Sequence, residues 1–150
     1  MAKTFDIQFQ LTSSSEQEAS GQFVTWGSAS TFGVRGFQFL INLWLKCLLT
    51  PRGSDPSDLN YGTDFTKLVG TLVPLEDARD VTLLAITQCN NQIAAFQRND
   101  STLTASELLA SAQLTNFVED TGSSRFDAYV ELKNRANERF TLSVPVSTGD

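Results

Sequence analysis

The chain contains no histidine, and this absence removes several kinds of functional site at once. Serine and cysteine nucleophiles are commonly activated by an imidazole, which is also the commonest general base and metal ligand. We therefore exclude Ser-His and Cys-His nucleophiles and histidine-bound metals. Glycine motifs for dinucleotides or phosphates are missing as well, so no cofactor is expected.

Cysteine is scarce, with Cys47 and Cys89 as the two thiols of the chain. Each lies in an apolar run with helical spacing, where a free cysteine behaves as a small hydrophobic residue. The first 20 residues are polar and lack the apolar centre of a signal peptide. We therefore expect a protein made in the reducing cytoplasm, without a disulfide framework.

Long apolar runs and an excess of positive charge are also missing. The longest apolar segment, residues 37–49, includes Lys46 and is too short and too polar to span a membrane. The net charge is −6, and an acidic chain gains nothing from releasing the counterions of a nucleic acid. We expect neither membrane nor nucleic acid as a partner. The 150 residues suffice for one domain with its own core.

Residues 34–49 have the spacing of a helix that is buried on most sides. Its polar side chains fall on one narrow stripe, formed by Arg35, Gln38, Asn42 and Lys46. A residue before a proline avoids the helical conformation, so the helix is expected to end before Pro51. The Gln38 and Asn42 amides contact either solvent or the backbone of another protein.

A second amphipathic helix is expected over residues 75–98. It follows Pro74, and the acidic residues of its first turn complement the helix dipole. A single helical turn is expected near residues 65–69. Thr104 and Glu107 match a capping box, which predicts the start of a further short helix.

Strict alternation marks the N-terminal residues 4–11 as a strand with one apolar face, formed by Phe5, Ile7, Phe9 and Leu11. A polar linker follows it, and a short strand or loop is expected over residues 22–32. The tethered strand either closes the protein's own sheet or adds to the sheet edge of a neighbour.

Three further strands are expected in the C-terminal third, near residues 114–118, 126–132 and 140–146. Pro145 cannot donate to a ladder, so the last strand is an edge there or ends there. The expected fold class is α+β, with two main helices packed on a small antiparallel sheet. Residues 1–33 form the extended strand and linker, and residues 34–150 form the domain.

The stretch CLLTPRGSDPSDLNYGTDF, residues 47–65, is rich in acids and turn formers, and an active-site loop, a metal loop and a corner between helices are its possible interpretations. A calcium loop that starts at Asp58 has Gly62 one residue early and Val69 where a bidentate acid is needed. A glycosidase needs two carboxylates about 5–10 Å apart in one cleft. Glu76, Asp77 and Asp80 are already accounted for by a helix N-terminus, and no carboxyl has the apolar surroundings of a general acid. Asp55 and Asp58 are expected to cap turns.

The run FQFLINLWLKCLLTPRGSDPSDLNYGTDF resembles the small baseplate wedge proteins of contractile-tailed phages, also called tail sheath initiators and once labelled lysozyme-like. The resemblance covers residues 35–146. In that family a helix with a glutamine ends in Leu-Leu-Thr, and a Pro-x-Gly turn and an Asp-x-x-(aromatic)-Gly element follow. The matching residues here are Gln38, Leu48, Leu49, Thr50, Pro51, Gly53, Asp58, Tyr61 and Gly62.

The resemblance implies a structural protein of the virion and not an enzyme, made in the host cytoplasm and present in six copies around the tail baseplate. Its expected partners are larger wedge proteins and the tail sheath protein, with the tail tube as a further candidate. Sheath arms would add as strands to a free sheet edge. The strands expected to do this are 140–146, with Phe140, Thr141, Leu142, Ser143 and Val144, and the tethered one, with Phe5, Ile7 and Phe9.

The family ends its long helix with Glu-Pro-Arg, which helps to dock the protein on wedge helices. This chain has Phe96-Gln97-Arg98 there, so Arg98 is carried over and the glutamate is not. Arg98 could donate in a fork to a partner carboxylate, or it could complement the helix dipole. A peptidoglycan-cleaving glycosidase and a general intracellular adaptor are the alternatives.

Overall fold

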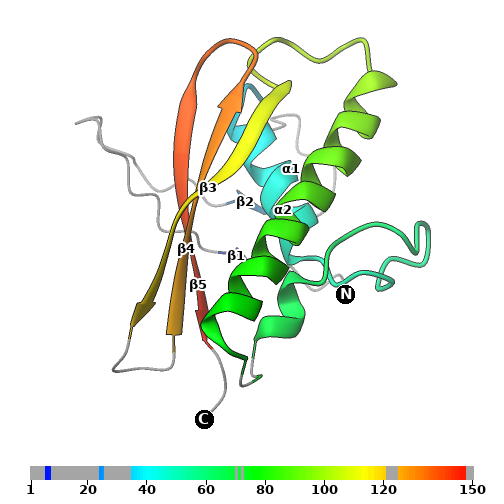
Figure 1. Cartoon of the computed structure of the whole chain (residues 1–150). Coiled ribbons are helices and arrows are strands. Elements are labelled where there is room, and N and C mark those ends of the chain that lie inside the picture. The colour runs from blue at the N-terminus through cyan, green and yellow to red at the C-terminus, as the bar shows by residue number, and fades with distance from the viewer. Residues whose placement is uncertain are drawn as a thin grey trace.

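The computed structural model describes residues 6–7, 24–25, 35–69, 71, 73–120 and 125–147. The expected α+β class is confirmed. Two long helices lie on one face of a three-stranded antiparallel sheet (Figure 1). The elements follow in the order β1 (Asp6–Ile7), β2 (Val24–Thr25), α1 (Phe37–Leu49), the 3-10 helix η1 (Phe65–Leu68), α2 (Leu75–Arg98), β3 (Leu109–Asp120), β4 (Arg125–Asn134) and β5 (Arg139–Ser147).

The sheet has the order β3-β4-β5, so β4 is central and β3 and β5 are its margins. Alternation along each strand decides which side chains meet the helices. On β4 and β5 every second side chain is buried against α1 and α2: Phe126, Ala128, Val130, Leu132, Leu142, Val144 and Val146. All of these except Ala128 form one core with Leu40, Trp44 and Leu48 of α1.

The helix that was expected from residue 34 begins at Phe37, because Gly36 adopts a φ of 67° and stands as its N-cap. The end at Leu49 is as expected, and Thr50 caps it with extended backbone. Helix α2 has the expected bounds, and η1 takes the place of the expected helical turn at 65–69. Of the described residues, no helix is both long and apolar enough to cross a bilayer.

The short helix expected at Thr104–Glu107 is wrong, because these residues form a turn that leads into β3. The Glu107 carboxylate accepts the backbone N–H of Thr104 at 2.9 Å, as in a capping box, but it also accepts the N–H of Gly36 at 3.1 Å. The turn is therefore anchored to the start of α1. Strand β3 begins at Leu109, five residues before the start expected from the sequence.

At the N-terminus, Asp6–Ile7 pairs antiparallel with Val24–Thr25, so Ile7 lies opposite Val24. This two-stranded pair is separate from the sheet of β3, β4 and β5. The remainder of the expected strand, including Phe5 and Phe9, lies outside the described residues.

Candidate interaction surfaces

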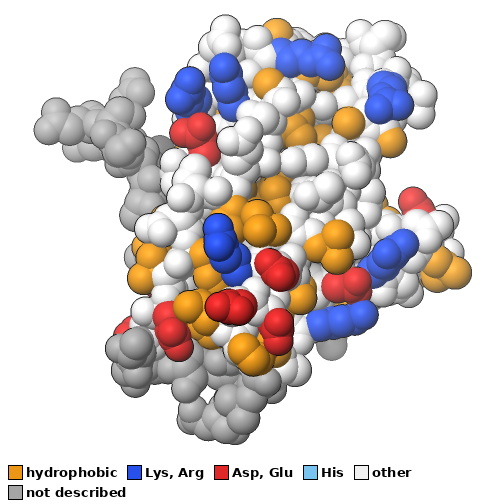
Figure 2. Space-filling view, viewed as in Figure 1, with side chains coloured by type: hydrophobic (Ala, Val, Ile, Leu, Met, Phe, Trp, Pro, Cys, Tyr) orange, Lys and Arg blue, Asp and Glu red, His pale blue; other side chains and the backbone are white. Residues whose placement is uncertain are grey.

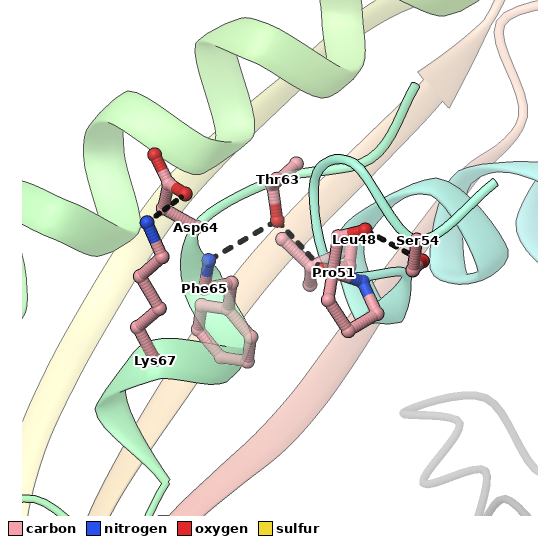
Figure 3. A network of polar contacts seen from close by, with 7 residues as sticks. All are labelled: Leu48, Pro51, Ser54, Thr63, Asp64, Phe65 and Lys67. Carbon is pink, nitrogen blue, oxygen red and sulfur yellow. Dashed lines mark hydrogen bonds and ion pairs between the residues drawn. The ribbon is translucent and has the colours of Figure 1, made fainter. Parts of the chain in front are cut away.

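The corner between α1 and η1 is built around Gly62 and Thr63. The N–H of Thr63 donates to the carbonyl of Thr50 at 2.9 Å, and the Thr63 hydroxyl donates to the carbonyl of Leu48 at 2.7 Å. Figure 3 shows this hydroxyl between Leu48 and the N–H of Phe65, which it accepts at 3.2 Å. Thr63, which has no exposed surface, thus joins the end of α1 to the beginning of η1.

Gln92 of α2 holds the same corner from the other side. Its Nε2 donates to the carbonyl of Gly62 at 2.9 Å, and its Oε1 accepts the N–H of Gly62 at 3.0 Å and the thiol of Cys47 at 3.3 Å. One amide therefore connects α1, the corner and α2. Sequence reasoning missed this residue, although a glutamine three positions after the buried Cys89 was a usable signal.

The acids of the corner cap turns, as the sequence predicted. Asp55 Oδ1 accepts the N–H and the hydroxyl of Ser57 at 2.9 and 2.6 Å, and these bonds lower the pKa of Asp55. Asp58 Oδ1 accepts the N–H of Asn60 at 2.9 Å. Across the described residues, no three histidine, cysteine or acidic side chains form a group suited to a metal ion.

A groove of about 630 Å³ is lined by residues of α1, the corner and the second half of α2. Apolar side chains line part of it, including Leu43 of α1, the half-buried Tyr61, and Phe96, which is 48% exposed. Burial raises the pKa of the Tyr61 hydroxyl above its usual range. The groove ends near the last turn of α2, and the exposed Arg98 lies in the same turn.

The two ends of α2 differ in charge. Figure 2 shows Lys and Arg side chains spread along the end of the molecule that holds the last turn of α2, and Asp and Glu side chains gathered, with one basic side chain among them, where α2 begins. Glu76, Asp77 and Asp80 are exposed on the first turns of α2, and Arg98 is exposed on the last. Arg98 thus lies at the cationic end of this face, where it can meet a carboxylate of another protein.

The amides of Gln38 and Asn42 lie on the half-buried stripe of α1, and Gln38 Nε2 donates to Asn42 Oδ1 at 3.1 Å. Each amide satisfies one polar atom of the other. This bond does not use the side-chain oxygen of Gln38 or the side-chain NH2 group of Asn42, and both can make a further contact.

In β5, the side chains expected to meet a partner divide between two faces of the sheet. Leu142 and Val144 are 5% and 8% exposed and belong to the core, and the Phe140 ring meets Phe37 of α1 edge to face at 6.5 Å. Thr141 and Ser143 point away from the helices. The side chains of Leu142 and Val144 therefore stabilise the domain itself.

Backbone N–H and C=O groups of β5 point alternately toward β4 and away from it, and the hairpin determines which residues point in which direction. Asn134 donates its N–H to Glu138, on the β5 side, and Arg135 donates its N–H to Leu108, on the β3 side. Because N–H groups alternate in direction along a strand, even-numbered residues of β4 bond to even-numbered residues of β5, with which they are in register. The N–H and C=O groups of Thr141 and Ser143 therefore point away from β4.

The two margins of the sheet differ in regularity. The β3–β4 register shifts at two places, between Leu109 and Ser111 and between Leu114 and Asn116, whereas the β4–β5 register runs without a shift from Arg125–Ser147 to Lys133–Arg139. Bulges twist an edge and make it a poor template for another strand. Within the described part of the chain, β5 pairs with β4 alone, so its regular outer edge is the better template.

Comparison with known proteins adds no assignment: no family model matches this chain, and no curated protein matches it.

Proposed function

We propose that this protein is a structural component of a contractile phage tail baseplate, where the outer edge of β5 nucleates the tail sheath. Extended arms of the first sheath subunits add to this edge as further strands. The role is structural and not catalytic. The observation that carries the proposal is the bulge-free β5, with the backbone groups of Thr141 and Ser143 directed outward.

Backbone pairing suits this role because the hydrogen bonds supply affinity while alternating side chains set the register. The edge is also rigidly supported. The side chain of Asn134, which is fully buried, donates to the carbonyl of Ser106 at 3.0 Å and accepts the N–H of Glu138 at 2.8 Å. These bonds tie the hairpin of β4 and β5 to the turn before β3, so little conformational entropy is lost when a strand adds.

The helical side of the molecule is the proposed contact with the wedge proteins. Arg98 would donate to a carboxylate or a helix C-terminus there, and the exposed Phe96 beside it adds apolar area. Gln38 and Asn42 offer their remaining amide groups on α1. Helices and sheet edge are separate surfaces of one domain, so the protein can hold wedge and sheath at the same time.

The test is a phage that lacks this gene, complemented with variants and viewed by negative-stain electron microscopy. Ser143→Pro and Thr141→Pro each remove one outward N–H and no bond to β4. We expect tubes and baseplates without sheaths for both variants, and normal sheaths for the control Ser143→Ala, which keeps the N–H. Deletion of residues 1–12 is expected to stop sheath assembly as well.

The variants must remain folded, which circular dichroism melting of the purified proteins establishes. Full-length sheaths on tails that carry either folded proline variant would overturn the proposal.

A further inference from the structure

Pro145 occupies a special position on β5. It pairs with Asp127 in the β4–β5 register and is an odd-numbered residue, so its missing N–H would have pointed outward, away from β4. The ladder inside the sheet therefore loses no bond to the proline. This is the arrangement in which proline is tolerated in an edge strand.

The proline interrupts the row of outward donors. Arg139, Thr141 and Ser143 each present an N–H and a C=O at the outer edge, whereas Pro145 presents a C=O alone. A strand that passed Pro145 would place one of its own carbonyls against the ring, without a donor. Pairing beyond Ser143 is thus penalised, and pairing over 139–143 is not.

We propose that Pro145 is a stop: it limits the part of β5 that can pair with an incoming strand to residues 139–143, and so it fixes the register of that strand. This inference rests on the proposed function, since it concerns the same edge. Pro145 is then a specificity-determining residue, because it donates no hydrogen bond to the incoming arm and determines where the pairing with that arm ends.

The same geometry describes the chemistry of the arm. Partner residues opposite Leu142 place their side chains on the helix-facing side, next to the core layer that Leu142 and Phe140 form. Partner residues opposite Thr141 and Ser143 place theirs on the other face, beside two hydroxyl groups. The arm is therefore a short extended segment in which apolar and polar residues alternate.

The test measures binding of the purified, monomeric sheath protein of the same phage to wild type, Pro145→Thr and Asn91→Ala. Pro145 is exposed and its replacement breaks no bond, so Pro145→Thr is expected to fold. The restored donor extends the ladder, and we expect about fivefold tighter binding, which corresponds to one net hydrogen bond. Asn91→Ala, an exposed position on α2, is expected to bind like wild type, because it leaves the β5 edge unchanged.

Residue-resolved amide exchange separates the outcomes. Tighter binding with a new protected amide at position 145 supports the stop. If wild type and Pro145→Thr bind the sheath protein with the same affinity, and the amide at position 145 is unprotected, the stop is overturned and the proposed function stands. If wild type does not bind the sheath protein, the proposed function fails and the stop fails with it.

Discussion

Replacing Gly62 by alanine tests whether the corner is built as described. Gly62 has a φ of 95°, and an added Cβ would lie 2.3 Å from the carbonyl oxygen of Thr50 and 3.2 Å from the carbonyl carbon of Pro51. Both neighbours are backbone atoms, which cannot rotate away. To relieve the clash the corner must open, and the Thr63 to Thr50 hydrogen bond is lost.

The cost has two parts. A positive φ costs a residue with a Cβ about 1–2 kcal/mol, and the lost hydrogen bond costs about 1 kcal/mol. We therefore expect Gly62→Ala to lower the free energy of unfolding by about 2–3 kcal/mol, out of a total of about 5–15 kcal/mol for a domain. For a chain of this size the corresponding fall in melting temperature is about 4–12 °C.

Gly53→Ala is the matched control, because Gly53 has a similar φ of 83° but no atom closer than 3.9 Å to an added Cβ. It carries the conformational cost without the clash, and the entropy that alanine removes from the unfolded chain is common to both variants. Urea unfolding of the two proteins measures the difference. Equal losses, or a larger loss for Gly53→Ala, would refute the clash and with it the described packing of the corner.

Two further predictions concern polar side chains that connect parts of the domain. Gln92→Ala removes two hydrogen bonds to Gly62 and is expected to lower the free energy of unfolding, measured in urea, by about 2 kcal/mol. Asn91→Ala, at an exposed neighbour on α2, should change stability little, and a Gln92→Ala protein as stable as wild type would show that these hydrogen bonds are not formed. The N–H groups of Thr104 and Gly36 lower the pKa of Glu107, so its stabilisation is complete above the unfolded-state pKa of about 4.3 and is lost as pH falls through the lower folded-state value. Glu107→Gln should thus be less stable than wild type at pH 7, with a gap that narrows as pH falls below about 4; a constant gap between pH 7 and pH 2 would contradict this.

Local patterns in the sequence carried much of the fold. The bounds of α2 follow from Pro74, the acids after it and the apolar spacing, and the alternation in β4 and β5 gives their buried faces. The error at Thr104–Glu107 has a long-range cause. Glu107 accepts a bond from Gly36, 71 residues away, and the next residues join a sheet whose partners lie beyond residue 125.

The candidate surfaces were predictable in part. The sequence placed Thr141 and Ser143 on an edge strand, and Pro145 indicated that an edge was there. It gave no means to distinguish outward from inward backbone groups, because that phase depends on the hydrogen bonds of Asn134 and Arg135 at the hairpin. The role of Gln92 likewise depends on a loop that folds back over α2.

The most direct test of the central claim is amide hydrogen exchange of β5, residue by residue, with and without the sheath protein. In the free protein we predict slow exchange at Leu142 and Val144, which bond to β4, and fast exchange at Thr141 and Ser143. Addition of the sheath protein should slow exchange at Thr141 and Ser143. If both amides continue to exchange rapidly in the complex, β5 is not the edge on which the sheath begins.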